Sequence, residues 1–169
     1  MGLVSFFKEA GQKLFGHKDA EAAAVQAQAA PDDAALQATA AAANQAAAAA
    51  IMTYIGTQDL DTSNISVEFD GASGSVMVSG MAVDQETKEK ILLCCGNVHG
   101  VGHVNDMMTV ETEADESQYH TVERGDTLSA IAKTYLGNAN EYPAIFEANK
   151  PMLSHPDKIY PGQMLRIPG

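Results

Sequence analysis

The chain has 169 residues and a formal net charge of −12, from 22 acidic and 10 basic side chains. This length allows one domain or two small ones. Residues 119–169 hold five acidic and five basic side chains, so the first 118 residues carry all the net negative charge. A surface this acidic repels phosphate and concentrates cations, so we expect no nucleic-acid partner and no binding to anionic membrane.

The two cysteines, Cys94 and Cys95, are adjacent in an apolar run. Disulfide scaffolds have spaced cysteines, so this pair predicts buried thiols in a reducing compartment. No basic stretch precedes the first apolar residues and Lys8 soon interrupts them, unlike a secretory signal. The alanine block is too weakly hydrophobic for a membrane span. We therefore expect a cytoplasmic protein without stable membrane insertion.

Residues 1–18 predict an amphipathic N-terminal helix. Apolar side chains recur there at helical spacing, with lysine, glutamate and glutamine opposite them. The apolar face has to pack on its own domain, on a partner or on a membrane. Its own domain is favoured, because the polar face lacks the lysine excess of membrane-surface helices. The apolar positions are Leu3, Phe6, Phe7, Ala10, Leu14 and Phe15.

Residues 20–50 contain 19 alanines, the residue with the best helix propensity. Pro31 divides this stretch, and we expect an Ala-rich linker over residues 19–33. A helix should begin near Asp32, with acidic residues at its positive end, and stop at Gly56. The stretch predicts a spacer rather than a site.

A β-hairpin is predicted over residues 65–79. Ile65, Val67 and Phe69 alternate with polar residues, and the alternation resumes after the glycine-rich turn at residues 71–74.

A further helix is expected after Asp84, which can cap it, with Glu86 and Glu89 facing Lys90. Three glycines then break the chain, and residues 103–110 return as a third strand.

Residues 119–169 form a closed module at the end of the chain, after an acidic linker over residues 112–118. A strand is expected within each of residues 119–128 and 159–168, with helices between them. Asp126 is expected to cap the first of these helices.

The C-terminal module contains the motifs Thr121–Leu128, Ile145–Asn149 and Tyr160–Gln163, and the preceding part contains Val76–Gly80 and Val98–Val101. Through these motifs the C-terminal module resembles a LysM domain, and residues 34–111 resemble a BON domain. Their order, after the amphipathic start, resembles the family of cytoplasmic potassium-binding BON–LysM proteins. The resemblance implies an α+β fold, with BON-type helices on a small mixed sheet followed by a βααβ LysM domain. The Ala-rich insert is the main departure.

A potassium site is chemically reasonable in such a chain. K⁺ is weakly hydrated and is bound by backbone carbonyls, which are free at glycine-rich turns and helix ends. The turn from Gly96 to Val101 is the best candidate. The alternative, compatible with the first, is that Gly96 and Gly100 serve only as a helix cap and a tight turn. The resemblance implies carbonyl ligands from the chain start and from the turn: Phe7, Lys8, Ala10, Gly96, Val98 and Val101.

Binding from both segments predicts that K⁺ orders the BON domain and its contact with LysM. The family resemblance implies a monomeric K⁺ sensor or buffer that supports growth under high potassium or osmotic stress. The alternative is an envelope-associated module whose LysM groove binds N-acetylglucosamine polymers weakly, through residues 125–128 and 149–159.

Other groups of residues give weaker support for a metal site or a catalytic site. Cys94, Cys95, His99 and His103 suit zinc or copper, but the glycines among them preclude a helix that would align the histidines. Asp59, Asp61 and Asn64 lack the glycine and distal glutamate of a calcium loop. The sequence has no catalytic motif for nucleophilic, phosphoryl or metal-dependent chemistry, so we expect no enzyme activity.

Overall fold

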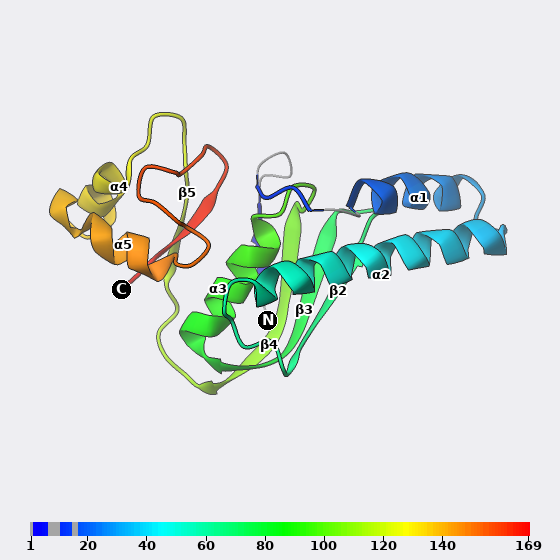
Figure 1. Ribbon diagram of the computed structural model, residues 1–169, viewed down its shortest axis with the longest axis horizontal. Helices are drawn as coiled ribbons and strands as arrows, with labels where there is room; N and C mark the ends of the chain where they lie inside the picture. Colours follow the sequence, from blue (N-terminus) through cyan, green and yellow to red (C-terminus); the bar gives the residue numbers. More distant parts are fainter. Residues whose placement is uncertain (1, 7–10, 15–16) are drawn as a thin grey trace.

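The computed structural model describes residues 2–6, 11–14 and 17–169. Figure 1 shows a central sheet covered by helices, a long helical arm at one end and a smaller module at the other. Within the described part of the chain, no helix combines the length and apolar character needed to cross a bilayer.

The central sheet has four strands in the order β1-β4-β3-β2. The strands β3 and β4 run parallel, whereas β2 pairs with β3, and β1 with β4, in antiparallel fashion. The sheet is therefore mixed, which confirms the α+β prediction. The strands span Gly2–Ser5 (β1), Ile65–Asp70 (β2), Ser75–Asp84 (β3) and His103–Thr112 (β4).

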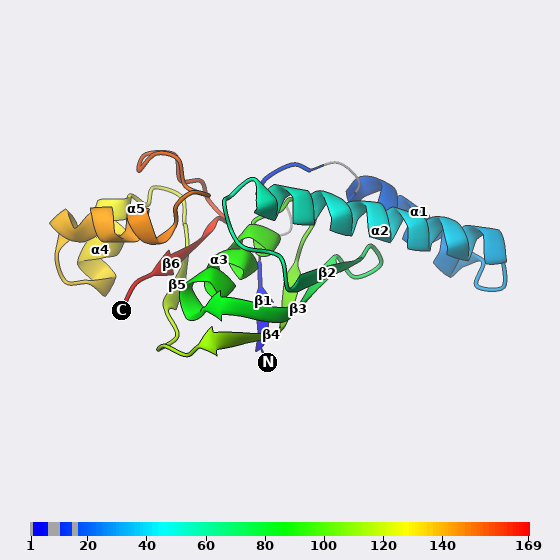
Figure 2. The same cartoon turned by 60° about the horizontal axis from the view of Figure 1, so that its bottom comes forward.

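Two helices, α2 (Ala34–Gly56) and α3 (Gln85–Gly96), cover one face of this sheet (Figure 2). Asp33 caps α2 and Asp84 caps α3, each accepting backbone N–H groups of the first turn. The buried residues of the strands alternate with exposed ones, as the sequence predicts. The core beneath the helices includes Ile51, Ile55, Val76, Val78, Ile91, Leu92, Val98, Val101 and Val104.

The prediction of a helix at the chain start is wrong for its first part. Gly2–Ser5 forms β1, and Leu3 on it is 64 % exposed. Pairing with β4 decides this conformation, because a tertiary ladder outweighs weak local helix propensity.

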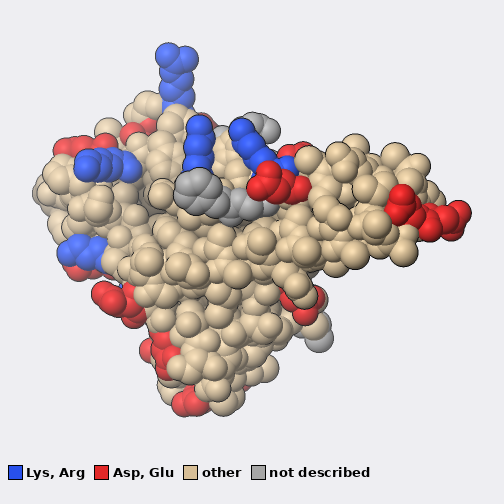
Figure 3. Space-filling view, turned by 45° about the vertical axis from the view of Figure 1, so that its right-hand side comes forward, with Lys and Arg blue, Asp and Glu red and all other residues tan. Residues whose placement is uncertain are grey.

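The predicted linker over residues 19–33 is also mostly helical. The helix α1 (His17–Ala29) packs antiparallel to α2 through Ala23, Ala27 and Ala40. Small side chains allow close approach of the two helices, and together they form an alanine arm. Residues 30–33 close its end, where Figure 3 shows acidic side chains.

The C-terminal module has its own core, around Leu128, Ile131, Ile145, Leu153 and Leu165. Its first helix is capped by Thr127 and not by Asp126, whose carboxylate instead binds His120 and the Glu123 N–H. The elements are β5 (Gln118–Thr121), α4 (Leu128–Tyr135), a 3-10 turn η1 (Ala139–Glu141), α5 (Tyr142–Ala148) and β6 (Met164–Ile167). The βααβ prediction is thus confirmed.

Candidate cation site

The turn between α3 and β4, residues 96–101, is called here the glycine turn. It begins where α3 ends, and Asn97 donates its N–H to the Leu93 carbonyl. The helix brings no basic residue to its last turn. The partial negative charge at a helix C-terminus therefore faces the turn without a side-chain cation from α3 to neutralise it.

Some carbonyl groups of the glycine turn accept no hydrogen bond from the described residues. Among the hydrogen bonds of the described residues, none reaches the carbonyl oxygens of Gly96 or Val101. The Val98 carbonyl accepts one, from the Val101 N–H at 3.1 Å, which leaves a second lone pair. The turn thus brings the three predicted ligands Gly96, Val98 and Val101 into one short loop with acceptor capacity to spare.

Hydrogen bonds on both sides of residues 7–10 hold the N-terminal segment against this turn and against Gly102, which follows it. Before them, the Phe6 N–H donates to the Gly102 carbonyl at 2.8 Å. After them, the Gln12 N–H donates to Asn97 and the Gln12 carbonyl accepts from His99, at 2.7 and 2.9 Å. The other predicted ligands, Phe7, Lys8 and Ala10, lie outside the described residues.

Glycine permits this close approach at two places. A Cβ on Gly96 would collide with the Phe6 ring, and one on Gly11 would collide with the Asn97 carbonyl. Gly11 also has a φ of +106°, which other residues rarely adopt. The C-cap of α3 is Asn97 and not Gly96, which is the last residue of the helix, whereas Gly100, with a φ of +98°, does serve the tight turn.

Asn97 connects the turn to the C-terminal module. Its side chain accepts the Met164 N–H and donates to the Met164 carbonyl, both at 2.9 Å. Asn97 is 3 % exposed, so these bonds are made away from water. The backbone carbonyl of Asn97 also accepts the Gln12 N–H. Asn97 therefore joins the N-terminal segment, the glycine turn and the C-terminal module.

A second link joins Glu89 on α3 to Arg166 on β6, with Nε and Oε2 2.6 Å apart. The Glu89 carboxylate also accepts from Gln85 and from the Ser117 N–H, both at 2.9 Å. Burial would raise the pKa of Glu89, but the hydrogen bonds from Arg166, Gln85 and Ser117 outweigh this effect and hold the pKa below its ordinary value. The prediction that Glu89 faces Lys90 is wrong, because Glu89 binds Arg166, whereas Lys90 pairs with Glu86 at 2.8 Å.

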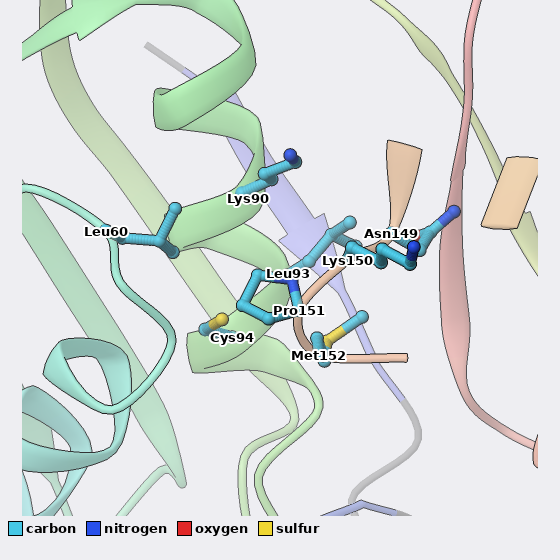
Figure 4. Close-up of a pocket in the computed structure, with 8 residues that line it drawn as sticks. All are labelled: Leu60, Lys90, Leu93, Cys94, Asn149, Lys150, Pro151 and Met152. Atoms are coloured by element: carbon cyan, nitrogen blue, oxygen red, sulfur yellow. The ribbon is translucent and has the colours of Figure 1, made fainter. Parts of the chain in front are cut away.

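The loop that starts at Asn149 lies against α3. Figure 4 shows Pro151 and Met152 beside Leu93 and Cys94, around a crevice of ≈ 10 Å³, about the space of one water molecule. This loop is one of the two expected walls of a glycan groove. Its beginning is therefore engaged with the BON-like part, whereas residues 154–155 and 157–158 stay exposed.

The alternative metal sites gain no support from the described residues. Burial raises the pKa of Cys94 to about 12, and that of Cys95 well above its ordinary value, so both thiols stay protonated. The Asp61 carboxylate turns back to the N–H and hydroxyl of Ser63. Within the described ranges, no three histidine, cysteine or acidic side chains gather around a common point.

Comparison with known proteins matches residues 43–112 to the BON domain and residues 120–168 to the LysM domain. The potassium binding protein Kbp of Escherichia coli O6:H1 is 45 % identical over 168 residues, which cover 99 % of each chain. The chain belongs to the family of Kbp. An uncharacterized protein of Deinococcus radiodurans is 39 % identical over 99 residues, 59 % of this chain and 31 % of that one.

The name of this Kbp relative describes a binding protein and no catalytic activity. The BON match begins within α2, so α1 and the first part of α2 fall outside both domain matches. The alanine arm is therefore an addition to the two recognised domains.

Sequence reasoning missed four residues at this site. Asn97 sits beside a predicted ligand, but a single asparagine gives no signal of a partner 67 residues away. Gly11 and Gln12 lie on a stretch expected to be helical. The glycine at position 11 was the available sign that the backbone there departs from a helix. His17, whose ring lies against Gly100, begins the expected linker and carried no signal.

Proposed function

We propose that this chain binds K⁺ through backbone carbonyls of the glycine turn and of the N-terminal segment. The ligands are the carbonyls of Gly96, Val98 and Val101, joined by those of Phe7, Lys8 and Ala10. The observation that supports this most is the acceptor-rich turn at the end of α3. The N-terminal segment is bonded to this turn after residues 7–10 and to Gly102, directly beyond the turn, before them.

The donor set favours K⁺ over smaller or divalent ions. Ca²⁺ and Mg²⁺ prefer carboxylates, and none of the described acidic side chains gathers with others there. Carbonyl oxygens alone suit a large monovalent ion that loses its water readily. The acidic N-terminal part raises the local cation concentration without choosing among cations.

The ion orders the two domains together in this proposal. K⁺ holds the N-terminal segment on the glycine turn, and Asn97 in that turn carries the bonds to Met164. The bound form is then the form with both domains docked, and the protein acts as a monomeric sensor or buffer of K⁺. Its buried free thiols agree with a cytoplasmic location, where high potassium or osmotic stress would call on it.

The first test compares KCl with NaCl at matched ionic strength. Calorimetric titration should give saturable binding of K⁺ alone, and K⁺ at 100 times its dissociation constant should stabilise the fold by about 2.7 kcal/mol. NMR should show amides 11–14 and 95–103 moving together. Equal thermal stability in the two salts contradicts the proposal.

The substitution Gly100→Ala tests the place of the site. Gly100 has a φ of +98°, and a Cβ there would lie 2.5 Å from a carbon of the His17 ring. The turn has to shift, so we expect K⁺ affinity to fall at least tenfold, about 1.4 kcal/mol.

Gly125→Ala is the matched control for this substitution. Gly125 has a φ of +95°, a Cβ added there would have no atom within 4 Å, and the residue lies in the C-terminal module. It carries the same backbone strain without the collision. K⁺ affinity should be unchanged, and equal losses in both variants would contradict a site at the glycine turn.

Glycan binding by the LysM domain is the competing function. It requires the loop after Asn149, whose first residues already contact α3 (Figure 4). A peptidoglycan pull-down that retains the protein, together with no calorimetric response to K⁺, would favour it over the ion site.

A further inference from the structure

Two histidines meet beside the glycine turn. His17 Nε2 and His99 Nδ1 are 3.2 Å apart, and the two rings are tilted by 56°. His17 opens α1 and is 8 % exposed, whereas His99 belongs to the turn itself and is half-buried. The missing side chain of Gly100 makes room for the His17 ring.

The hydrogen bonds of His17 fix the tautomer that a metal ligand needs. Its Nδ1 lies 3.1 Å from the Leu14 carbonyl, and a carbonyl can only accept, so Nδ1 carries the proton. Neutral His17 therefore presents a lone pair at Nε2, toward His99. A backbone carbonyl that holds the outer N–H of a histidine is the usual support of a metal-binding imidazole.

The spacing of the two nitrogens also fits a shared metal ion. Two nitrogens that each lie about 2.0–2.1 Å from one ion are about 2.9 Å apart at a right angle and about 3.4 Å apart at a tetrahedral angle. The observed 3.2 Å lies between these two values. The two nitrogens are therefore already at the separation that a shared ion requires, and the rings must rotate so that both lone pairs point toward it.

We propose that His17 and His99 form a two-imidazole site for a divalent transition-metal ion, with Zn²⁺ as the probe. Imidazole nitrogens suit Zn²⁺, Ni²⁺ and Cu²⁺ and do not suit K⁺. The ion takes the place of the proton that His99 Nδ1 donates, and His99 carries its proton on Nε2 instead, so both imidazoles bind as neutral ligands. Water completes the coordination, since the described residues supply no third histidine, cysteine or acidic ligand.

The position of the pair gives this site a regulatory consequence, which rests on the K⁺ function proposed above. His99 lies between Val98 and Gly100, so a divalent ion there is close to the carbonyls assigned to K⁺. Two cations at such short range repel each other. Bound Zn²⁺ should therefore weaken K⁺ binding, and K⁺ should weaken Zn²⁺ binding by the same factor.

The test is a calorimetric titration with ZnCl₂ in NaCl buffer, on the full chain without a histidine tag. Zn²⁺ should bind the unaltered protein, and about tenfold or more weakly after His17→Gln or His99→Gln. His155→Gln is the control, because His155 is exposed and lies in the other domain. Equal binding by all four proteins would overturn the site.

NMR of the histidine rings in the unaltered protein tests the site even if the His17→Gln variant fails to fold. Zn²⁺ should shift the ring signals of His17 and His99, and movement of His103, His120 or His155 in their place would overturn the assignment. The K⁺ titration is then repeated with Zn²⁺ present. Unchanged K⁺ affinity would overturn the coupling alone, whereas no K⁺ binding in zinc-free protein would overturn the proposed function alone.

Discussion

Arg166→Met should lower the free energy of unfolding by about 3 kcal/mol, because it leaves the buried Glu89 carboxylate without its cation. Glu89 is 1 % exposed, and Arg166 Nε lies 2.6 Å from it. Gln85 and Ser117 still donate to the carboxylate, which keeps the loss at the lower end for a broken buried pair. Urea denaturation followed by circular dichroism measures the change.

Two further variants separate the ion pair from general damage. Lys150→Met removes the exposed pair with Glu147, and it should cost less than about 1 kcal/mol. Glu89→Gln combined with Arg166→Met removes both charges, so it should recover part of the stability lost in Arg166→Met. A double variant as unstable as the sum of its parts would mean that the pairing is not the cause.

The same pair predicts an acid dependence. The pKa of Glu89 is held below its ordinary value in the folded state, so its contribution is fully present above the unfolded pKa. The contribution is lost as pH falls through the folded pKa, below the usual range of a glutamate. Unfolding measured between pH 6 and 3, about the range of carboxyl titration, should show this loss in the unaltered protein and less of it in Glu89→Gln.

Asn97→Ala should lower the free energy of unfolding by about 2–4 kcal/mol. It should also prevent K⁺ binding at the glycine turn from affecting the C-terminal module. The variant leaves the N–H and carbonyl of Met164 without partners in a buried place, at about 1–3 kcal/mol for each unsatisfied group. In the unaltered protein, K⁺ should slow amide hydrogen exchange at Met164 as well as in the glycine turn. In Asn97→Ala, the effect of K⁺ should stop at the turn.

Asn140→Ala is the control for this variant. Asn140 is exposed in the C-terminal module, and its substitution should leave both the stability and the K⁺ effect on exchange unchanged. If Met164 in Asn97→Ala still responds fully to K⁺, the coupling runs through other contacts, such as Glu89 and Arg166.

Local sequence patterns predicted the helices and strands whose conformation depends mainly on neighbouring residues. The alternation of Ile65, Val67 and Phe69 is the alternation of buried positions in β2. Asp84 caps α3 as its position suggested, and α2 starts close to Asp32 as expected, with Asp33 as its cap. Each of these features depends on residues within one turn or one strand, so the local sequence is enough to predict it.

Features that depend on distant partners could not be predicted in this way. The strand β1 has only four residues and takes its conformation from β4, about 100 positions later. Glu89 looks like a surface charge on α3, and only its partner 77 residues away makes it a buried ion. At the candidate cation site, glycines marked the turn, but its attachment to Gln12 and Met164 is a property of the folded chain.

The pairing of β1 with β4 has one more consequence. The ladder from Gly2 to Ser5 covers the outer side of β4 at residues 103–106, which would otherwise be an open edge of the sheet. An open edge offers unpaired N–H and carbonyl groups to other chains and promotes aggregation. Under the proposed function, loss of K⁺ would free the N-terminal segment and uncover this edge, so we expect more self-association in K⁺-free than in K⁺-bound protein.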